Sequence, residues 1–316
     1  MQWQYFCKTL NFSLLEKFKD FCYTFIWVIL LKIEFINKNV VLYNPPDFDP
    51  EQTFMCGQCF RWDKLDDNSF FGVAHGKPLK ISSHGEKIIF HNCSLEDYYN
   101  IWEKYFDIGR DYYAIKKKLS SDPIMKKATE KGSGIRILKQ DLWETTISFI
   151  ISASNNIPRI KKIITSLCEN FGDKIDDNIY SFPTCERLQG ITVDQLAPIR
   201  AGFRAKYIVD AVSKVSSGEV DFSSLEQLDT PSARKELLKI NGIGNKVADC
   251  ILLFALGRTE VFPVDVWINK TMCKLYPDRF MSLADVRAAG PEIFGKHCGI
   301  AQQYLFYYAR ENGGNI

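Results

Sequence analysis

The residue with the clearest chemical potential is Lys246, which follows an Asn-Gly-Ile-Gly connection at residues 241–244. Helical patterns flank this connection, so the segment predicts two helices joined by a tight hairpin. Lys246 then lies in the first turn of the second helix, where the helix dipole disfavours a cation. This setting eases loss of the proton that a nucleophilic amine must give up. The alternative is a surface lysine without a catalytic role.

The hairpin itself predicts a phosphate contact. Gly242 and Gly244 permit positive φ and let another backbone approach closely. The N-terminus of the following helix has free N–H groups that can bind a phosphate oxygen. Such a contact holds a nucleic acid without reading its sequence. The alternative is an ordinary connection between two helices.

Two further residues could act together with the lysine. Cys250 lies four residues beyond Lys246, hence on the same helical face, and the two could line one pocket. Asp265 precedes a helical pattern and is predicted to be its N-cap. It could be a plain cap, or its carboxylate could stabilise positive charge developing on a sugar.

The elements that must position these residues indicate an α+β protein. Strand-like runs at 33–43, 59–65, 70–75, 79–82 and 87–90 predict an antiparallel sheet. From Ser94, a probable N-cap, the pattern becomes helical and continues to the end of the chain. The expected helices are 115–119, 124–131, 142–152, 157–171, 184–190, 193–196, 205–215, 234–239, 245–256, 266–275, 283–294 and 299–310.

Composition limits the function classes. The formal net charge of the 316 residues is +2, so a nucleic-acid surface must come from local clustering, such as the nine basic and three acidic residues between 110 and 139. A solvated helix face is the alternative explanation for that cluster. The apolar run 21–31 is too short to span a membrane, and we assign no role to residues 1–32.

The ten cysteines show no disulfide framework and favour a reducing interior. Cys56 and Cys59 form a close pair, but no second pair completes a tetrahedral metal site. The sequence therefore predicts no metal site.

Several motifs together resemble those of the 8-oxoguanine DNA glycosylases. The hairpin and lysine, followed by Val-Asp-Val at 264–266, resemble the helix-hairpin-helix motif of bifunctional DNA glycosylases. Further matches occur in the family's order at 57–62, 155–159, 202–207 and 299–306. The resemblance implies an N-terminal antiparallel sheet domain (TBP-like, residues 33–131) and an all-α helix-hairpin-helix glycosylase bundle (132–316), preceded by an extension (1–32).

The resemblance also implies the reaction and the base pocket. Lys246 would attack the sugar, release 8-oxoguanine and form a Schiff base that undergoes β-elimination, with Asp265 stabilising the positive charge. The base would be flipped out of the duplex to reach the pocket. Four residues would then recognise it: the Gly57 carbonyl at N7–H, Gln302 at the Watson–Crick edge, and Phe306 and Cys250 by stacking on its two faces.

The remaining residues implied by the resemblance contact the DNA. Phe203 looks like the wedge that fills the gap left by the flipped nucleotide, and Arg159 and Arg204 would reach the orphaned cytosine. Asn155 and Trp267 are expected at the DNA surface. Trp267 stands where the eukaryotic enzymes have a histidine. In having tryptophan at this position, the chain is similar to the bacterial branch of the family. Residue 154 is serine rather than asparagine, and this predicts a weaker preference for cytosine.

The expected partner is duplex DNA containing 8-oxoguanine, bound by a monomer that has no membrane association. The expected location is intracellular: cytoplasm or nucleoid in a bacterium, nucleus in a eukaryote. No cofactor is expected to be required, although a monovalent or divalent cation could bind at the hairpin. Two alternatives stay open: a glycosylase of this fold for another damaged base, and a noncatalytic helix-hairpin-helix module that only binds DNA.

Overall fold

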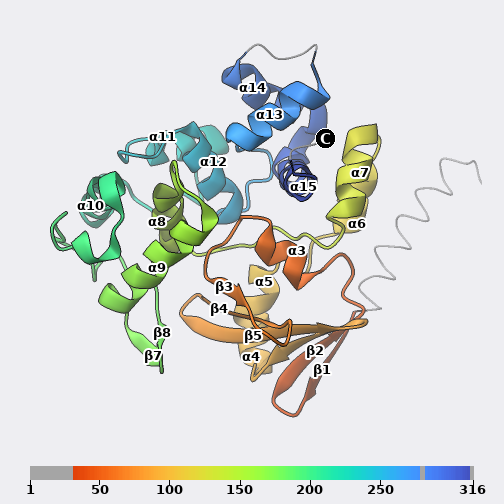
Figure 1. The fold of residues 1–316 in the computed structure, drawn as a ribbon, viewed down its shortest axis with the longest axis horizontal. Coiled ribbons are helices and arrows are strands. Elements are labelled where there is room, and N and C mark those ends of the chain that lie inside the picture. Colours follow the sequence, from red (N-terminus) through yellow and green to blue (C-terminus); the bar gives the residue numbers. More distant parts are fainter. Residues whose placement is uncertain (1–30, 278–281, 314–316) are drawn as a thin grey trace, which may run out of the picture.

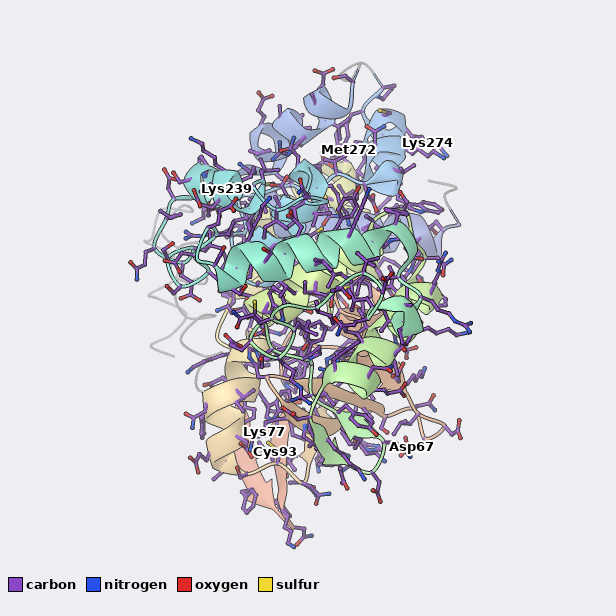
Figure 2. All side chains as sticks on the ribbon, turned by 90° about the vertical axis from the view of Figure 1, so that its left-hand side faces the viewer. Asp67, Lys77, Cys93, Lys239, Met272 and Lys274 are labelled. Carbon is purple, nitrogen blue, oxygen red and sulfur yellow. The ribbon has the colours of Figure 1, made fainter. Side chains whose placement is uncertain are left out.

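The computed structural model describes residues 31–277 and 282–313. The predicted extension 1–32 lies almost wholly outside the described residues. A sheet forms one half of the molecule and a helical bundle the other (Figure 1). Figure 2 shows the same halves from the side, with Asp67 and Lys77 in the sheet half and Lys239 and Met272 in the helical half. The α+β prediction is confirmed.

The sheet has six antiparallel strands in the order β1-β2-β6-β5-β4-β3. One expectation was wrong, because residues 33–43 form two strands rather than one. Asn37 and Lys38 between them have φ of 50° and 64°, the two positive values that a tight two-residue hairpin turn requires. The strands are β1 (Lys32–Ile36), β2 (Asn39–Tyr43), β3 (Trp62–Lys64), β4 (Phe70–Ala74), β5 (Lys77–His84) and β6 (Lys87–His91).

Aromatic side chains form the core beside the sheet. The Trp62 ring stacks on Phe54 with centroids 4.1 Å apart, and its Nε1 donates to the Tyr105 hydroxyl at 2.8 Å. The contributing segments are α3 (Pro50–Met55), the π-helix η1 (Tyr98–Trp102) and α5 (Glu103–Tyr105), while α4 (Leu95–Asp97), which precedes η1, has no buried residue. Ser94 is the N-cap of α4, as predicted. Helix α3 was not predicted from the sequence, although Asp49 caps it and Pro50 is its first residue.

The rest of the chain is mainly helical. Two expected helices, 184–190 and 193–196, are runs of turns, and residues 174–180 form a small unpredicted hairpin of β7 (Lys174–Asp176) and β8 (Ile179–Tyr180). The other helices are α6 (Tyr112–Leu119), α7 (Pro123–Lys131), α8 (Leu142–Ser152), α9 (Ile157–Phe171), η2 (Ala197–Ile199), η3 (Gly202–Arg204), α10 (Ala205–Ser216), α11 (Thr230–Leu237), α12 (Asn245–Phe254), α13 (Val266–Leu275), α14 (Leu283–Phe294), η4 (Gly295–His297) and α15 (Cys298–Glu311).

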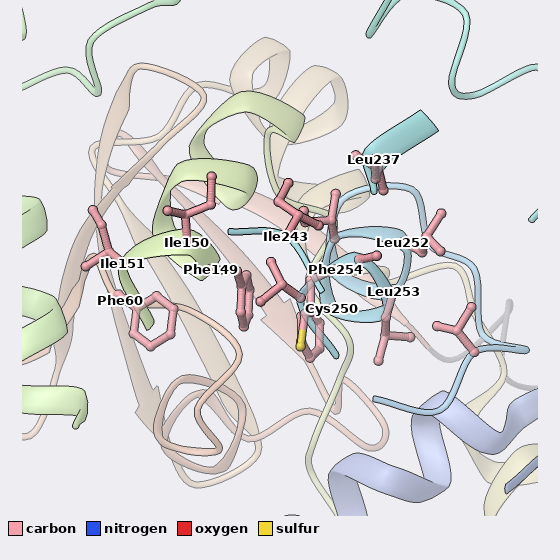
Figure 3. Packing of buried hydrophobic residues seen from close by; sticks show 14 of the residues in the cluster. Phe60, Phe149, Ile150, Ile151, Leu237, Ile243, Cys250, Leu252, Leu253 and Phe254 are labelled. Carbon is pink, nitrogen blue, oxygen red and sulfur yellow. The ribbon is translucent and has the colours of Figure 1, made fainter. Parts of the chain in front are cut away.

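A large apolar core holds α12 against α8. Phe149 of α8 and Phe254 of α12 stack with ring centroids 5.5 Å apart, and Cys250 lies next to them (Figure 3). Buried residues of α6 and α7 belong to this same core. The domain boundary at 131/132 therefore stays a prediction. Within the described ranges no helix is both long and apolar enough to cross a membrane.

The link between the two halves is polar and buried. The Arg136 side chain is 1% exposed, and its guanidinium donates to the carbonyl oxygens of Asp107 and Pro46 at 2.6 and 2.8 Å. The Gln58 amide lies beside it and donates to the Arg136 carbonyl at 2.7 Å. These bonds tie the loop that carries Gly57 to the segment leading into the bundle.

Candidate active site

The hairpin between α11 and α12 has the predicted geometry. Gly242 has φ of 88°, and a Cβ there would lie 2.5 Å from Cγ of Tyr207, so only glycine fits. Gly244 is the N-cap residue of α12, and open space surrounds the place of its missing side chain. The start of α12 is thus open at Gly244, and the phosphate contact stays a prediction.

Lys246 lies in the first turn of α12. Its Nζ is 5.1 Å from the centroid of the Phe149 ring, a cation–π distance. The lysine lines two adjoining hollows, a narrow cleft of about 50 Å³ and an open cleft of about 690 Å³. Asp265 lines both as well, so the two groups meet where the clefts join.

The narrow cleft collects all six residues predicted for catalysis and base recognition. They are Lys246, Asp265, Gly57, Cys250, Gln302 and Phe306. Five residues of its wall were not predicted: Cys56, Phe149, Phe254, Pro263 and Gln303. Since the predicted six span residues 57 to 306, chain folding rather than local sequence brings them together.

Asp265 is the N-cap of α13, as predicted. Its Oδ1 accepts a hydrogen bond from the backbone N–H of Ile268 at 2.7 Å. This bond fixes the carboxylate at the helix start, facing the clefts that Lys246 lines. Capping and a catalytic role are therefore compatible in one side chain.

Cys250 lies on the same face of α12 as Lys246. Burial raises the pKa of its thiol to about 11, although the nearby Lys246 opposes that shift. At neutral pH the side chain is therefore an uncharged thiol. A neutral, polarisable group of this kind suits contact with the face of a flat base.

Gly57 occupies a position that strongly favours glycine. Its φ is 82°, and a Cβ would approach Cε1 of Phe306 to 3.2 Å. The next residue, Gln58, is fully buried and anchors the loop. Its Nε2 donates to the carbonyl of Thr53 at 2.9 Å, and its Oε1 accepts from the N–H of Leu138 at 2.9 Å.

The open cleft gathers three of the seven residues predicted to contact DNA. Asn155, Arg159 and Trp267 line it, and Trp267 is half exposed. Asn155 donates from Nδ2 to the carbonyl of Ile151 at 3.1 Å. Phe203 lies outside the lining of this cleft, on η3, and is 53% exposed.

Arg204 is not at the surface. Its side chain is 2% exposed, and Nη2 donates to the carbonyl of Ser154 at 2.8 Å while Nε donates to that of Ala153 at the same distance. The guanidinium therefore holds the loop that follows α8. Burial also lowers its pKa, with a smaller contribution from the positive charge of Arg159.

Cys56 and Cys59 belong to no cluster of metal-binding side chains among the described residues. Both are buried, and burial raises both thiol pKa values, that of Cys56 to about 12. In residues 31–277 and 282–313 no group of three or more histidine, cysteine, aspartate or glutamate side chains could hold a metal ion. The cation predicted at the hairpin stays a prediction.

Comparisons with known proteins agree with this geometry. Residues 40–146 match the family model "8-oxoguanine DNA glycosylase, N-terminal domain", and residues 147–281 match "HhH-GPD superfamily base excision DNA repair protein". A "Probable N-glycosylase/DNA lyase" of Methanothermobacter thermautotrophicus is 31% identical over 67% of this chain and 74% of its own length. The chain belongs to the 8-oxoguanine DNA glycosylase/lyase family.

Other relatives of this glycosylase support the assignment. The "N-glycosylase/DNA lyase" of Saccharomyces cerevisiae is 39% identical over 43% of this chain, a match that spans 40% of the yeast protein. The structure of MBOgg1 with a low affinity DNA ligand has a TM-score of 0.87, 45% identity, and coverage of 90% of this chain and 99% of that one.

A second solved structure has the same architecture over nearly its whole length. The Clostridium acetobutylicum 8-oxoguanine glycosylase/lyase, in complex with double-stranded DNA containing cytosine opposite 8-oxoguanine, has a TM-score of 0.86. It is 42% identical over 89% of this chain and 98% of that one. The predictions of a glycosylase fold, a DNA lyase and a DNA partner are thereby confirmed.

Proposed function

We propose that this enzyme excises 8-oxoguanine from duplex DNA with Lys246 as nucleophile and Asp265 as its carboxylate partner. The observation that carries the proposal is the narrow cleft, in which both residues meet Gly57, Gln302 and Phe306. Nucleophile, carboxylate and base-recognition groups converge there from both halves of the fold. A clamp that only holds phosphate needs no such cleft.

In the proposed reaction the free amine of Lys246 attacks C1′ of the damaged nucleotide. The glycosidic bond breaks, and the base leaves with the bonding electrons and takes up a proton. The amine then forms a Schiff base with the opened sugar, and loss of a proton from C2′ expels the 3′ phosphate by β-elimination. Asp265 stabilises the positive charge that develops on the sugar as the base departs.

For base recognition we propose that the Gly57 carbonyl accepts the N7–H that guanine lacks. Gln302 bonds to the Watson–Crick edge, and Phe306 and Cys250 contact the two faces of the ring. The cleft of about 50 Å³ is narrow in this structure. We propose that a side chain such as Phe306 moves aside to admit a purine.

We propose that the open cleft receives the duplex. Phe203 fills the gap left by the flipped nucleotide, while Asn155 and Trp267 contact the DNA backbone. Arg159 is exposed and can reach the orphaned cytosine directly. Arg204 reaches that base only if its hydrogen bonds to the carbonyls after α8 open.

A weaker preference for cytosine follows from Ser154. This residue is exposed with φ of 49°, and its short hydroxyl cannot fill the space that an asparagine would. We expect excision opposite adenine to be only modestly slower than excision opposite cytosine. A strong block opposite adenine would contradict this expectation.

We also propose a monomer that needs no cofactor, acts inside the cell and has no membrane association.

Borohydride trapping on a duplex with one 8-oxoguanine opposite cytosine tests the mechanism. Wild-type protein should form a covalent complex only on damaged DNA, and Lys246→Gln should form none because it has no amine. Base release without trapping would mean a monofunctional enzyme and a different role for Lys246. DNA binding by the wild-type protein without trapping or base release would leave a noncatalytic DNA module, and preference for another lesion would indicate a different substrate.

A further inference from the structure

One polar group in the narrow cleft has no partner. Gln303 is 4% exposed and lines the cleft beside Gln302. Its Oε1 is buried and makes no hydrogen bond to the described residues. A buried acceptor without a donor costs free energy, so an orphaned one on a residue that lines a ligand cleft points to a donor on the ligand.

The two glutamine amides lie end to end. Nε2 of Gln303 donates to Oε1 of Gln302 at 2.9 Å. This bond fixes the orientation of the Gln302 amide and leaves its Nε2 group as a donor. The pair then offers the Nε2 donor and the Oε1 acceptor of Gln302 together with the unpartnered acceptor Oε1 of Gln303.

We propose that Gln303 is a second base-reading residue, whose Oε1 accepts a hydrogen bond from the exocyclic 2-amino group. The inference rests on the proposed function. The Watson–Crick edge of 8-oxoguanine presents O6, N1–H and the 2-amino group in order, an acceptor followed by two donors. Gln302 matches the first two groups, and Gln303 matches the third.

This arrangement makes the enzyme selective for purines that carry a 2-amino group. An adenine-type edge presents a donor where O6 would be and has no amino group at C2, so Gln303 would stay unpaired. A site built to bond a polar group rejects analogues that lack it, because its own buried group is left unsatisfied.

The test compares two lesions that differ only in this group, 8-oxoguanine and 8-oxohypoxanthine, each opposite cytosine under single-turnover conditions. We expect wild-type protein to excise 8-oxoguanine roughly tenfold faster. Equal rates would overturn the proposal without any variant. If wild type excises neither base, the proposed function itself fails, which is a distinguishable result.

The variant Gln303→Met keeps the size of the side chain and removes its amide. It should slow excision of 8-oxoguanine by roughly tenfold, slow 8-oxohypoxanthine much less, and so abolish the discrimination. Strand cleavage at a preformed abasic site needs no base and should be unchanged. An equal loss of excision rate on both bases would overturn the proposal and leave Gln303 as a support for Gln302. An equal loss of strand cleavage at the abasic site would also overturn it and would show that Gln303 acts only through folding.

Discussion

Asp265 combines a structural and a chemical role in one carboxylate. Its Oδ1 caps α13, which explains why sequence reasoning alone could favour a plain cap. Aspartate and asparagine are comparable N-caps, because either side-chain oxygen accepts from the helix N–H groups. Only aspartate carries the negative charge that a developing sugar cation requires. The two roles can therefore be separated by one substitution.

We expect Asp265→Asn to keep the stability of the protein and to lose excision by about 100-fold or more, as when other transition-state charge stabilisers are removed. Asp229→Asn is the matched control, because Asp229 caps α11 through Ser232 N–H at 2.8 Å and does not line either cleft. Thermal unfolding and single-turnover excision would be measured for both. Equal excision by the two variants would reduce Asp265 to a cap.

At this scale the sequence predicted the site only where the residue type itself was informative. Lys246 and Asp265 stood out because a lysine in a first helical turn and an aspartate before a helix have physical meaning. Gln303 did not stand out in the sequence, because its burial depends on how α15 packs in the bundle. It lies 100° around the helix from Gln302, and the sequence alone does not tell whether that position faces the core or solvent. The inward orientation of Arg204 could not be predicted from the sequence either, because its hydrogen-bond partners are carbonyl oxygens of a loop that is distant in the sequence.

The helix that carries Lys246 is held from two sides. Asp249, three residues later, is fully buried and accepts from Nε of Arg234 at 2.8 Å and from Nε of Arg287 at 2.7 Å. These arginines belong to α11 and α14, so one carboxylate links three helices. Its removal would leave two guanidinium groups without their shared counter-charge.

Asp249→Asn should therefore lower the free energy of unfolding by about 3–5 kcal/mol, the usual effect of breaking a buried ion pair. Glu236→Gln serves as the control on the neighbouring helix. Glu236 pairs with Lys239 at 2.7 Å, and the lysine is 41% exposed, so its loss should cost less than about 1 kcal/mol. Urea unfolding measures both. Similar small changes would show that α12 does not depend on this ion pair.

Helix prediction succeeded where capping residues bound a long pattern. The ranges of α8 and α9 were predicted to the residue, and Asp141 and Asn156 cap them. It failed at 184–190, a stretch of seven residues that follows Pro183 and ends at Gly190. So short a segment closes turns without sustaining a helix. The main strands of the sheet were predicted, but the turn at Asn37 that divides residues 33–43 into two strands was not. An Asn-Lys pair is a weaker signal for such a turn than Asn-Gly.

At the scale of the whole molecule, the base pocket exists only because the two halves meet. Gly57 comes from the sheet half, and Lys246 and Phe306 come from the bundle, so no single part holds the cleft. The buried bonds of Gln58 and Arg136 maintain this meeting point. The net charge of +2 is too small to draw DNA to the molecule as a whole. Binding must then depend on a few charges around the open cleft.

We therefore expect Lys270→Gln to weaken binding of damaged and undamaged duplexes alike, because Lys270 is exposed on the rim of the open cleft. The slope of log affinity against log salt concentration should fall by about 1, the value for one lost phosphate contact. Lys38→Gln, in the exposed β1–β2 turn, removes the same charge far from both clefts and should leave the slope unchanged. An equal fall for both variants would mean that diffuse charge, rather than this cleft, holds the duplex.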